Sequence, residues 1–192
     1  MRLFVAIYPP SEVVAHLGVQ VARLRAGARA AAGIDVRLAD PADAHVTLAF
    51  LGDVEAERLV AVQSALGLAA DRFRDGRPAA PRLRLAGGGR FGQDRSTVLW
   101  VDLRGEVESV ETLAQLIRSR LRHADLSYDE RPFRPHLTVA RPGDRMSPVD
   151  VAADTATLDD YEGPQWPATE MVLVRSHPGP RHTYERLAAW PL

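Results

Sequence analysis

The chain has 192 residues, no cysteine, and 24 basic against 25 acidic side chains, which gives a formal net charge of −1. This length suits one well-cored domain of about 100–200 residues, and the balanced charge argues against the global basic field of a protein that binds long duplexes. The missing cysteines exclude a disulfide framework, a thiol nucleophile and a thiolate metal site.

The first quarter of the chain predicts a strand followed by a helix. Residues 2–8 form an apolar strand that two prolines end, and this run is too short for a signal-peptide core or a membrane span. Ser11 is expected to cap a helix whose apolar residues follow 3-4-3 spacing: Val14, Leu17, Val21 and Leu24. A breaker-rich stretch from Gly27 then leads to a strand at His45.

The middle of the chain predicts two more helices around a pair of strands. Asp53 is a candidate cap for a helix with apolar residues at the same 3-4-3 spacing: Leu59, Val62, Leu66 and Ala69. Strands over residues 83–85 and 98–103 flank a glycine run at 87–89, which we expect to be a flexible turn or cleft-side loop. A third amphipathic helix over residues 106–123 carries on one face Val107, Val110, Leu113, Ile117 and Leu121.

The last third predicts a strand from His136, an irregular Pro/Asp-rich stretch over residues 142–166, and closing strands over 171–175 and 183–187. No linker divides the chain. Short strands with mixed connections favour an α+β fold over a doubly wound parallel sheet, and the glycine run lacks the spacing of a dinucleotide-binding loop or a P-loop.

Two segments repeat one pattern, H-[V/L]-T-[V/L]-A-x-x-G, beginning at His45 and at His136, 91 residues apart (136 − 45). Because alternate residues of a strand share a face, His45 lies on the same face as Thr47, and His136 on the same face as Thr138. The repeat distance is close to half of the chain length. We therefore expect two similar lobes, each presenting one His/Thr pair to a shared cleft across a pseudo-two-fold axis.

Two facing imidazoles can act as an acid and a base, because the unperturbed pKa of histidine is about 6.5. In-line displacement at phosphorus needs one group that removes a proton from the attacking oxygen and another that protonates the leaving oxygen. The two threonine hydroxyls could hydrogen-bond the non-bridging phosphate oxygens. A zinc site is disfavoured because neither pair has a His or Cys partner at ligand spacing. A Ser-His-Asp hydrolase is disfavoured because the chain has no G-x-S-x-G elbow.

The paired H-x-T strands, with the Arg-Pro-Phe-Arg-Pro segment at 131–135 directly before the second, resemble the two-histidine (2H) phosphoesterase superfamily. Within it, the chain is similar to the bacterial RNA 2′,3′-cyclic phosphodiesterases, also named 2′-5′ RNA ligases. The similarity runs nearly end to end and includes Arg2-Leu3-Phe4-Val5-Ala6, Val98-Leu99-Trp100, Tyr184, Leu187 and Trp190-Pro191-Leu192.

The resemblance implies one bilobal α+β domain over residues 1–192, with two antiparallel sheets that line a central cleft and helices packed outside. It implies hydrolysis of an RNA or nucleotide 2′,3′-cyclic phosphate to the 2′-phosphomonoester, with no metal and no cofactor. By the matching positions, His45 would protonate the 3′ oxygen, His136 would activate water, and Thr47 and Thr138 would contact the phosphate. The pseudo-symmetry leaves the acid and base roles interchangeable from sequence alone. In reverse, the site could join the cyclic phosphate to a 5′-hydroxyl.

Phe50 and Arg141 stand five residues after the two histidines, at positions that the resemblance links to gripping the terminal base by stacking and cation–π contact. Residues five apart on a regular strand point to opposite faces, so these two residues reach the face of the histidines only if each strand ends or bulges first. Phe50 could instead belong to the core. Asp43 stands where relatives often carry Asn, and its carboxylate would raise the pKa of His45 if it lay close. Arg134 could reach the phosphate or pair with a surface carboxylate.

The expected partner is the 3′ end of an RNA, or a nucleotide, that carries a 2′,3′-cyclic phosphate. We expect a monomeric, cytoplasmic protein that does not bind membranes. Two alternatives stay open: a nucleotide-binding module without turnover, and a phosphodiesterase for another cyclic phosphate such as ADP-ribose cyclic phosphate. A basic stretch over residues 72–84 could guide RNA, but a solvated face is favoured. No role is assigned to the remaining histidines, which are His16, His123, His177 and His182.

Overall fold

The structure, a computed structural model, describes residues 1–77, 79–179 and 183–192. In chain order its strands and α-helices are β1 (Arg2–Ile7), α1 (Ser11–Arg23), α2 (Arg25–Ala31), β2 (Arg37–Leu38), β3 (Val46–Asp53), α3 (Leu59–Arg74), β4 (Arg82–Phe91), β5 (Val98–Gly105), α4 (Val107–His123), β6 (His136–Arg141), α5 (Pro148–Asp159), β7 (Glu162–Pro167), β8 (Glu170–His177) and β9 (Thr183–Pro191). No helix within the described ranges is long and apolar enough to cross a membrane.

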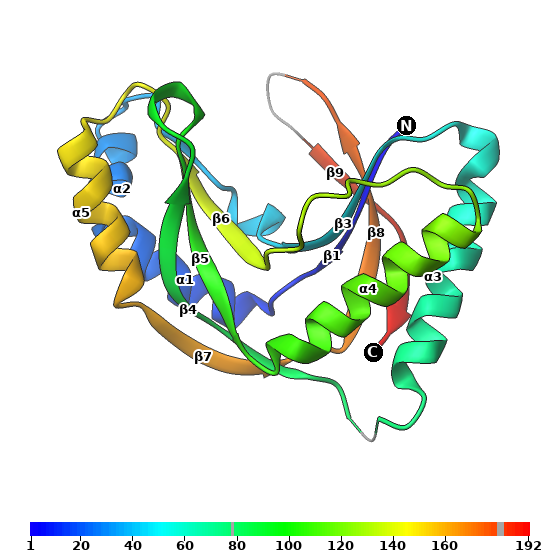
Figure 1. The fold of residues 1–192 in the computed structure, drawn as a ribbon. Coiled ribbons are helices and arrows are strands. Elements are labelled where there is room, and N and C mark those ends of the chain that lie inside the picture. Colours follow the sequence, from blue (N-terminus) through cyan, green and yellow to red (C-terminus); the bar gives the residue numbers. More distant parts are fainter. Residues whose placement is uncertain (78, 180–182) are drawn as a thin grey trace.

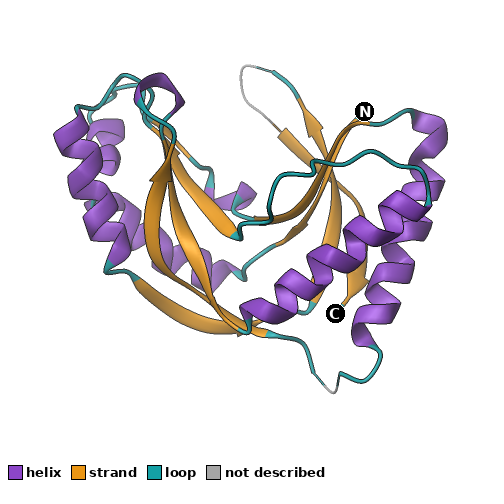
Figure 2. Ribbon diagram, viewed as in Figure 1, coloured by secondary structure: helices purple, strands orange, loops and turns teal. Residues whose placement is uncertain are grey.

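The strands form two facing walls with helices on their outer sides (Figures 1 and 2). Strands β1, β3, β8 and β9, covered by α3 and α4, are called lobe A. Strands β4 to β7 with the short β2, covered by α1, α2 and α5, are called lobe B. The chain leaves lobe A after β1 to form α1 and α2 on lobe B, and returns after β5 to place α4 on lobe A. Each lobe is therefore built from segments that are far apart in the sequence.

The α+β class and the bilobal arrangement are confirmed, but the two expected sheets are joined. Within the described residues all strand pairs belong to one antiparallel sheet, in the order β7-β4-β5-β6-β3-β1-β8-β9 with β2 beside β6. The junction is a single residue pair between β3 and β6, Val46 with Leu137, which we call the central pair. Both side chains are buried in the core. Beyond this pair the strands separate, and the space between the lobes opens.

The amphipathic patterns predict most of the core correctly. Of the nine apolar residues predicted to face the core in the last two helices, Leu59 and Val107 are half-buried and the others are buried: Val62, Leu66, Ala69, Val110, Leu113, Ile117 and Leu121. The predicted caps are wrong. Ser11 is the first residue of α1, after Pro10, and makes no capping hydrogen bond. Asp53 ends β3 rather than capping α3, which begins at Leu59 after a short 3-10 turn at Ala56–Arg58.

Two stretches that were expected to be irregular contain helices and a strand, and the prediction failed for the same reason in both. The stretch after Gly27 contains part of α2, and residues 142–166 contain α5 and all of β7 except its last residue. Asp154 of α5 is buried, and its carboxylate accepts hydrogen bonds from the backbone N–H groups of Arg25 (2.8 Å) and Ala26 (2.9 Å) at the start of α2. This cap comes from a residue distant in the sequence, so no local pattern could predict it.

The glycine run is part of strand β4 rather than a loop. Gly87 has a φ of +73° and lies where the β4–β5 register shifts. A Cβ at Gly88 would lie 2.6 Å from the Cβ of Leu158 on α5, and a Cβ at Gly89 would lie 2.5 Å from the Trp100 ring. The run therefore lets α5 and a tryptophan pack directly onto the two faces of the strand.

Candidate active site

The two H-x-T segments lie side by side where the lobes meet. Because the central pair points into the core, the residues next to it on each strand point into the space between the lobes. Continuing the antiparallel register by one residue sets His45 opposite Thr138, and Thr47 opposite His136. A local two-fold axis through the central pair thus relates the two halves, and each lobe supplies one imidazole and one hydroxyl to a shared site.

A matching bulge follows each motif, so that Phe50 and Arg141, five residues after the two histidines, face the inner side of their lobes. In β3, Leu48 is an extra residue, because Val5 pairs with Ala49 while the next residue of β1 already pairs with Thr47. In β6, Val139 is the extra residue in the register with β5. The bulge that the five-residue offset requires is therefore present in both strands.

Both imidazoles are held in the same way. The Nδ1 atom of His45 lies 2.6 Å from the carbonyl oxygen of Asp43, and that of His136 lies 2.8 Å from the carbonyl oxygen of Arg134. Because a carbonyl only accepts, Nδ1 carries a proton and donates it in each case. The Nε2 atoms are then the groups that can take or give a proton.

His45 is surrounded by aromatic rings of lobe A. Its ring stacks on Phe4 with centroids 4.9 Å apart, and the rings of Tyr8 and Tyr184 lie 5.7 and 5.5 Å away. Burial is the main cause that lowers the pKa of His45, and the positive charge of His136 adds to the effect, while the hydrogen bond to the Asp43 carbonyl opposes it. Burial also raises the pKa of Tyr8 to about 12, so this phenol stays protonated.

His136 contacts the aromatic rings of lobe B. The ring of Phe91 meets it edge to face at 4.9 Å, and the ring of Trp100 lies 6.3 Å away. Phe91 and Trp100 stack on each other with centroids 4.9 Å apart, and the guanidinium of Arg134 lies 5.1 Å from the centroid of each ring.

Charged side chains also surround His136. Burial is again the main cause that lowers its pKa, and the positive charges of Arg134 and Arg141 lower it further. The Arg134 carbonyl and the carboxylate of Asp102, which stands opposite His136 in the β5–β6 register, raise it. The net effect is a lowered pKa for His136, as for His45.

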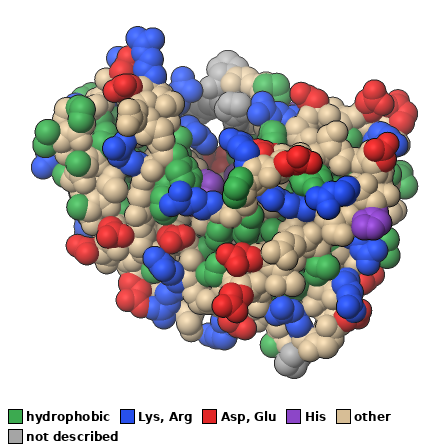
Figure 3. Space-filling model, viewed as in Figure 1, with side chains coloured by type: hydrophobic (Ala, Val, Ile, Leu, Met, Phe, Trp, Pro, Cys, Tyr) green, Lys and Arg blue, Asp and Glu red, His purple; other side chains and the backbone are tan. Residues whose placement is uncertain are grey.

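The motifs open onto a cleft of about 970 Å³. Figure 3 shows the hollow between the lobes, with arginine surface around it and histidine surface inside. The cleft is lined by the segment 35–40, Asp43, His45, Thr47, His136, Thr138, Arg141, Thr183 and Tyr184. All four residues of the predicted catalytic set are therefore brought together in one cavity.

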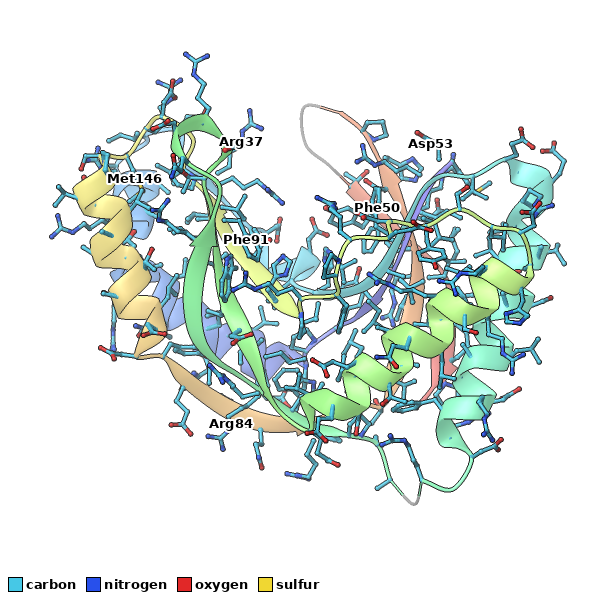
Figure 4. All side chains as sticks on the ribbon, in the orientation of Figure 1. Arg37, Phe50, Asp53, Arg84, Phe91 and Met146 are labelled. Carbon is cyan, nitrogen blue, oxygen red and sulfur yellow. The ribbon has the colours of Figure 1, made fainter. Side chains whose placement is uncertain are left out.

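The two predicted base-binding residues are placed differently. Arg141 lines the cleft and stands opposite Arg37 in the β2–β6 register, so two cations are neighbours there. Phe50 is half-buried on the inner face of lobe A, opposite Phe4, with the guanidinium of Arg2 5.0 Å from its ring centroid, and it does not line the cleft. Figure 4 labels Phe50 on one wall and Phe91 on the other.

Asp43 acts on His45 through its backbone rather than through its carboxylate. The carbonyl accepts the imidazole proton, and the side chain lines the cleft, where burial and Asp40 raise its pKa. The sequence alone allows an effect of the Asp43 carboxylate on the pKa of His45. In the structure, the main-chain carbonyl of Asp43 makes the contact with His45 instead.

The arginines of the 72–84 stretch and the described histidines His16, His123 and His177 do not line the cleft. One of these five arginines, Arg84, pairs with Glu162. Three of the other histidines bond nearby groups, namely the Tyr161 hydroxyl for His16, the Ser119 carbonyl for His123 and the Glu185 carboxylate for His177. His182 lies outside the described residues.

Several site residues were not predicted from the sequence as functional. They are Phe4, Tyr8, Arg37, Phe91, Trp100, Asp102 and Tyr184. Most come from strands that carry no motif, and they reach the histidines through strand pairing and sheet curvature. Segments containing Phe4, Trp100 and Tyr184 did carry the family resemblance, which is the one signal that could have indicated them.

Comparison with known proteins gives one consistent result. The family model of the 2′-5′ RNA ligase superfamily matches residues 9–180. The RNA 2′,3′-cyclic phosphodiesterase of Geobacillus stearothermophilus is 31% identical over 152 residues, which cover 78% of this chain and 46% of the relative. The enzyme of the same name from Escherichia coli K12 is 36% identical over 97 residues, half of each chain. The matched region thus spans about half the length of these two relatives.

Solved structures match over their whole length. The protein TT0787 of Thermus thermophilus has a TM-score of 0.74 at 29% identity, covering 100% of this chain and 98% of its own. E. coli LigT complexed with 3′-AMP has a TM-score of 0.69 at 27% identity, covering 100% and 97%. E. coli LigT has also been solved with NADP+, with a TM-score of 0.73 at 25% identity and coverage of 100% and 97%.

Proposed function

Since the chain belongs to the 2′-5′ RNA ligase superfamily, we propose that it hydrolyses the 2′,3′-cyclic phosphate of an RNA 3′ end or a nucleotide to the 2′-phosphomonoester. The observation that carries this proposal is the pair of H-x-T strands that meet at the central pair and open onto one cleft. Relatives named RNA 2′,3′-cyclic phosphodiesterase support the same substrate class.

In the proposed reaction His136 is the general base and His45 is the general acid. Nε2 of His136 takes a proton from water as the oxygen attacks phosphorus, and Nε2 of His45 gives a proton to the departing 3′ oxygen. The assignment follows the matching positions of the family, because the pKa of His136 and the pKa of His45 are both lowered, in each case mainly by burial. The carbonyls that hold both Nδ1 atoms keep each ring in one orientation.

The two threonines and Arg141 would bind the anionic phosphate. The hydroxyls of Thr47 and Thr138 approach the phosphate from opposite lobes, and they can donate to the non-bridging oxygens, where negative charge grows in the transition state. Arg141 adds a positive charge at the cleft wall.

For the terminal base we propose contacts with Arg141 and Phe50. Burial is the main cause that raises the pKa of Tyr184, whereas the positive charges of Arg141 and of Arg2, which covers Phe50, lower it. Tyr184 also lines the cleft together with Arg141 and packs, like Phe50, against the cluster that contains Phe4. A base stacked there would meet an aromatic ring and a guanidinium, which bind any base without reading its sequence.

The experiment that tests the function uses purified protein with EDTA. The four nucleoside 2′,3′-cyclic monophosphates and a short RNA with a cyclic phosphate end are incubated with it, and the 2′- and 3′-phosphate products are resolved. We expect the 2′-phosphate alone, and its loss in His45→Ala and His136→Ala variants that unfold at the wild-type temperature. Binding without turnover, or activity that either variant retains, would reject this function in favour of a binding module or another cyclic phosphate.

A further inference from the structure

Lobe B carries an aromatic and cationic surface whose two rings have no role in the proposed hydrolysis. It consists of Phe91, Trp100 and Arg134, and we call it the Phe91 cluster. The two rings stack on each other, and the Arg134 guanidinium lies at the same 5.1 Å distance from both centroids. Phe91 is half-buried, Arg134 is exposed, and Trp100 is 7% exposed. Trp100 is therefore the buried part of the cluster, and Phe91 and Arg134 are its accessible part.

The backbone around the cluster is shaped to hold it. Trp100 stands between Gly89 on β4 and Thr138 on β6, and directly opposite residues of a sheet share a face. Its ring lies over Gly89, where a Cβ would come within 2.5 Å of it. Because the glycine leaves this space, the tryptophan lies low against the sheet, and Phe91 stacks on it beside the cleft.

Arg134 is committed to the rings rather than to a carboxylate. Its neighbours in lobe B, Arg84 and Arg104, each form an ion pair, with Glu162 and Asp102 respectively. Within the described ranges Arg134 has no such partner, and its side chain is exposed. An exposed guanidinium beside a stacked aromatic pair is the combination that binds a nucleobase through stacking and cation–π contact.

The position of the cluster indicates which nucleoside it would hold. Phe91 touches the His136 ring, whereas Phe50, proposed for the terminal base of the cyclic phosphate, lies on the opposite wall (Figure 4). In the proposed reaction His136 activates the entering oxygen. A nucleoside held on the Phe91 cluster would therefore lie on the side from which the oxygen attacks.

We propose that the Phe91 cluster is the subsite that binds the base of an acceptor nucleoside with a free 5′-hydroxyl in the joining reaction for which the family is named. This inference rests on the proposed function and on the assignment of His136 as base. The 5′ oxygen attacks phosphorus and its proton passes to His136, while the bond from phosphorus to the 3′ oxygen breaks and His45 protonates that oxygen. The product is a 2′-5′ phosphodiester with a free 3′-hydroxyl, and no further reactant is needed.

The test compares two acceptors with one donor. Wild-type protein is incubated with adenosine 2′,3′-cyclic phosphate and either adenosine or methyl ribofuranoside, which has a 5′-hydroxyl but no base. The readout is the ratio of joined product to 2′-AMP. Because both products come from the same bound donor, competition of adenosine for the donor site lowers both and leaves the ratio unchanged. We expect a ratio about ten-fold higher for adenosine, since stacking of one base is worth roughly this factor or more.

Variants then locate the effect. Phe91→Leu keeps the apolar bulk but removes the aromatic face, and should reduce the advantage of adenosine to within about two-fold. Phe91→Tyr should retain the advantage. Phe50→Leu is the matched control on the opposite wall, and should lower formation of both products without changing their ratio. Thermal unfolding of each variant shows whether it is folded.

The outcomes separate this inference from the proposed function. Hydrolysis with no joined product, equal ratios for the two acceptors, or an adenosine advantage that survives Phe91→Leu would each overturn the acceptor subsite while leaving the phosphodiesterase intact. Absence of both products from every donor would reject the proposed function itself.

Discussion

The two histidines have the same backbone setting but different neighbours. Each follows a residue pair whose first carbonyl holds its Nδ1 atom, and each is followed by the same bulge. His45 is enclosed by the rings of lobe A, and the side-chain charge that acts on its pKa is that of His136. His136 lies among two arginines and an aspartate.

This difference teaches how a symmetric scaffold can support asymmetric chemistry. The repeated segments set equal positions for the rings, whereas non-repeated residues on other strands set their charges. The charged groups next to His136 raise or lower its pKa, while the aromatic rings around His45 shield that ring from water. If His136 is the base and His45 is the acid, the same substitution at the two residues should therefore give different results.

The largest expected effect concerns the leaving group. His45→Ala and His136→Ala should each lower the rate on a normal cyclic phosphate by about 10²–10⁴-fold. On an analogue with sulfur in place of the 3′ bridging oxygen, the leaving thiolate needs no proton, so His45→Ala should regain most of its rate and His136→Ala should not. Rates of thiol release give the measurement. Rescue of the His136 variant instead would reverse the assigned roles.

The next effect concerns the hydroxyls on the two sides of the dyad. Thr47→Val and Thr138→Val keep the side-chain shape and remove one donor each, and should each lower kcat by about 10–100-fold with a smaller change in KM. Because the local axis relates the two residues, the two losses should agree within a few-fold. Steady-state kinetics on one cyclic nucleotide tests this, and a loss confined to one variant would show that the phosphate lies off the axis.

A smaller effect is expected in the pH profile. Asp102 raises the pKa of His136, so Asp102→Asn should lower it. A base must be neutral, so kcat/KM falls as the pH drops through the pKa of His136, and this acid limb should move to lower pH in the variant.

Asp43→Asn is the matched control, because Asp43 contacts His45 through its carbonyl. The limb assigned to His45 should keep its position. The measurement is kcat/KM across the acid and neutral range, and a shift in the Asp43 variant without one in the Asp102 variant would contradict the charge environments described above.

The smallest effect compares two glycines that each lie against a tryptophan. Gly89→Ala places a Cβ 2.5 Å from the Trp100 ring within strand β4 and should destabilise the protein by about 1–3 kcal/mol. Gly67→Ala, on α3 in lobe A, places a Cβ 3.3 Å from Nε1 of Trp190, and the gain of about 1 kcal/mol in helix propensity should offset the contact. Chemical denaturation measures both. Equal stabilities would mean that Trp100 can move away from β4 without cost.

The sequence predicts the site better than it predicts the frame around it. The four catalytic candidates were identifiable because a repeat of spaced residue types needs no tertiary information. Helix α2 and the cap from Asp154 were not identifiable, because the contact that forms them joins residues far apart in the chain. Gly89 was misinterpreted because a glycine run favours turns locally, whereas here Trp100 requires the space. The charges around His136 depend on strand pairing, which one sequence does not specify.

The central pair also determines how the site responds to motion. It is the single point at which strand pairing joins the two lobes within the described part of the chain, and it lies on the axis that exchanges the two imidazoles. Any displacement that treats the lobes alike changes both ring-to-phosphorus distances by the same amount. In the proposed reaction, such a displacement would tighten or loosen the contacts to the entering and the departing oxygen together, which would keep the two oxygens in line with phosphorus.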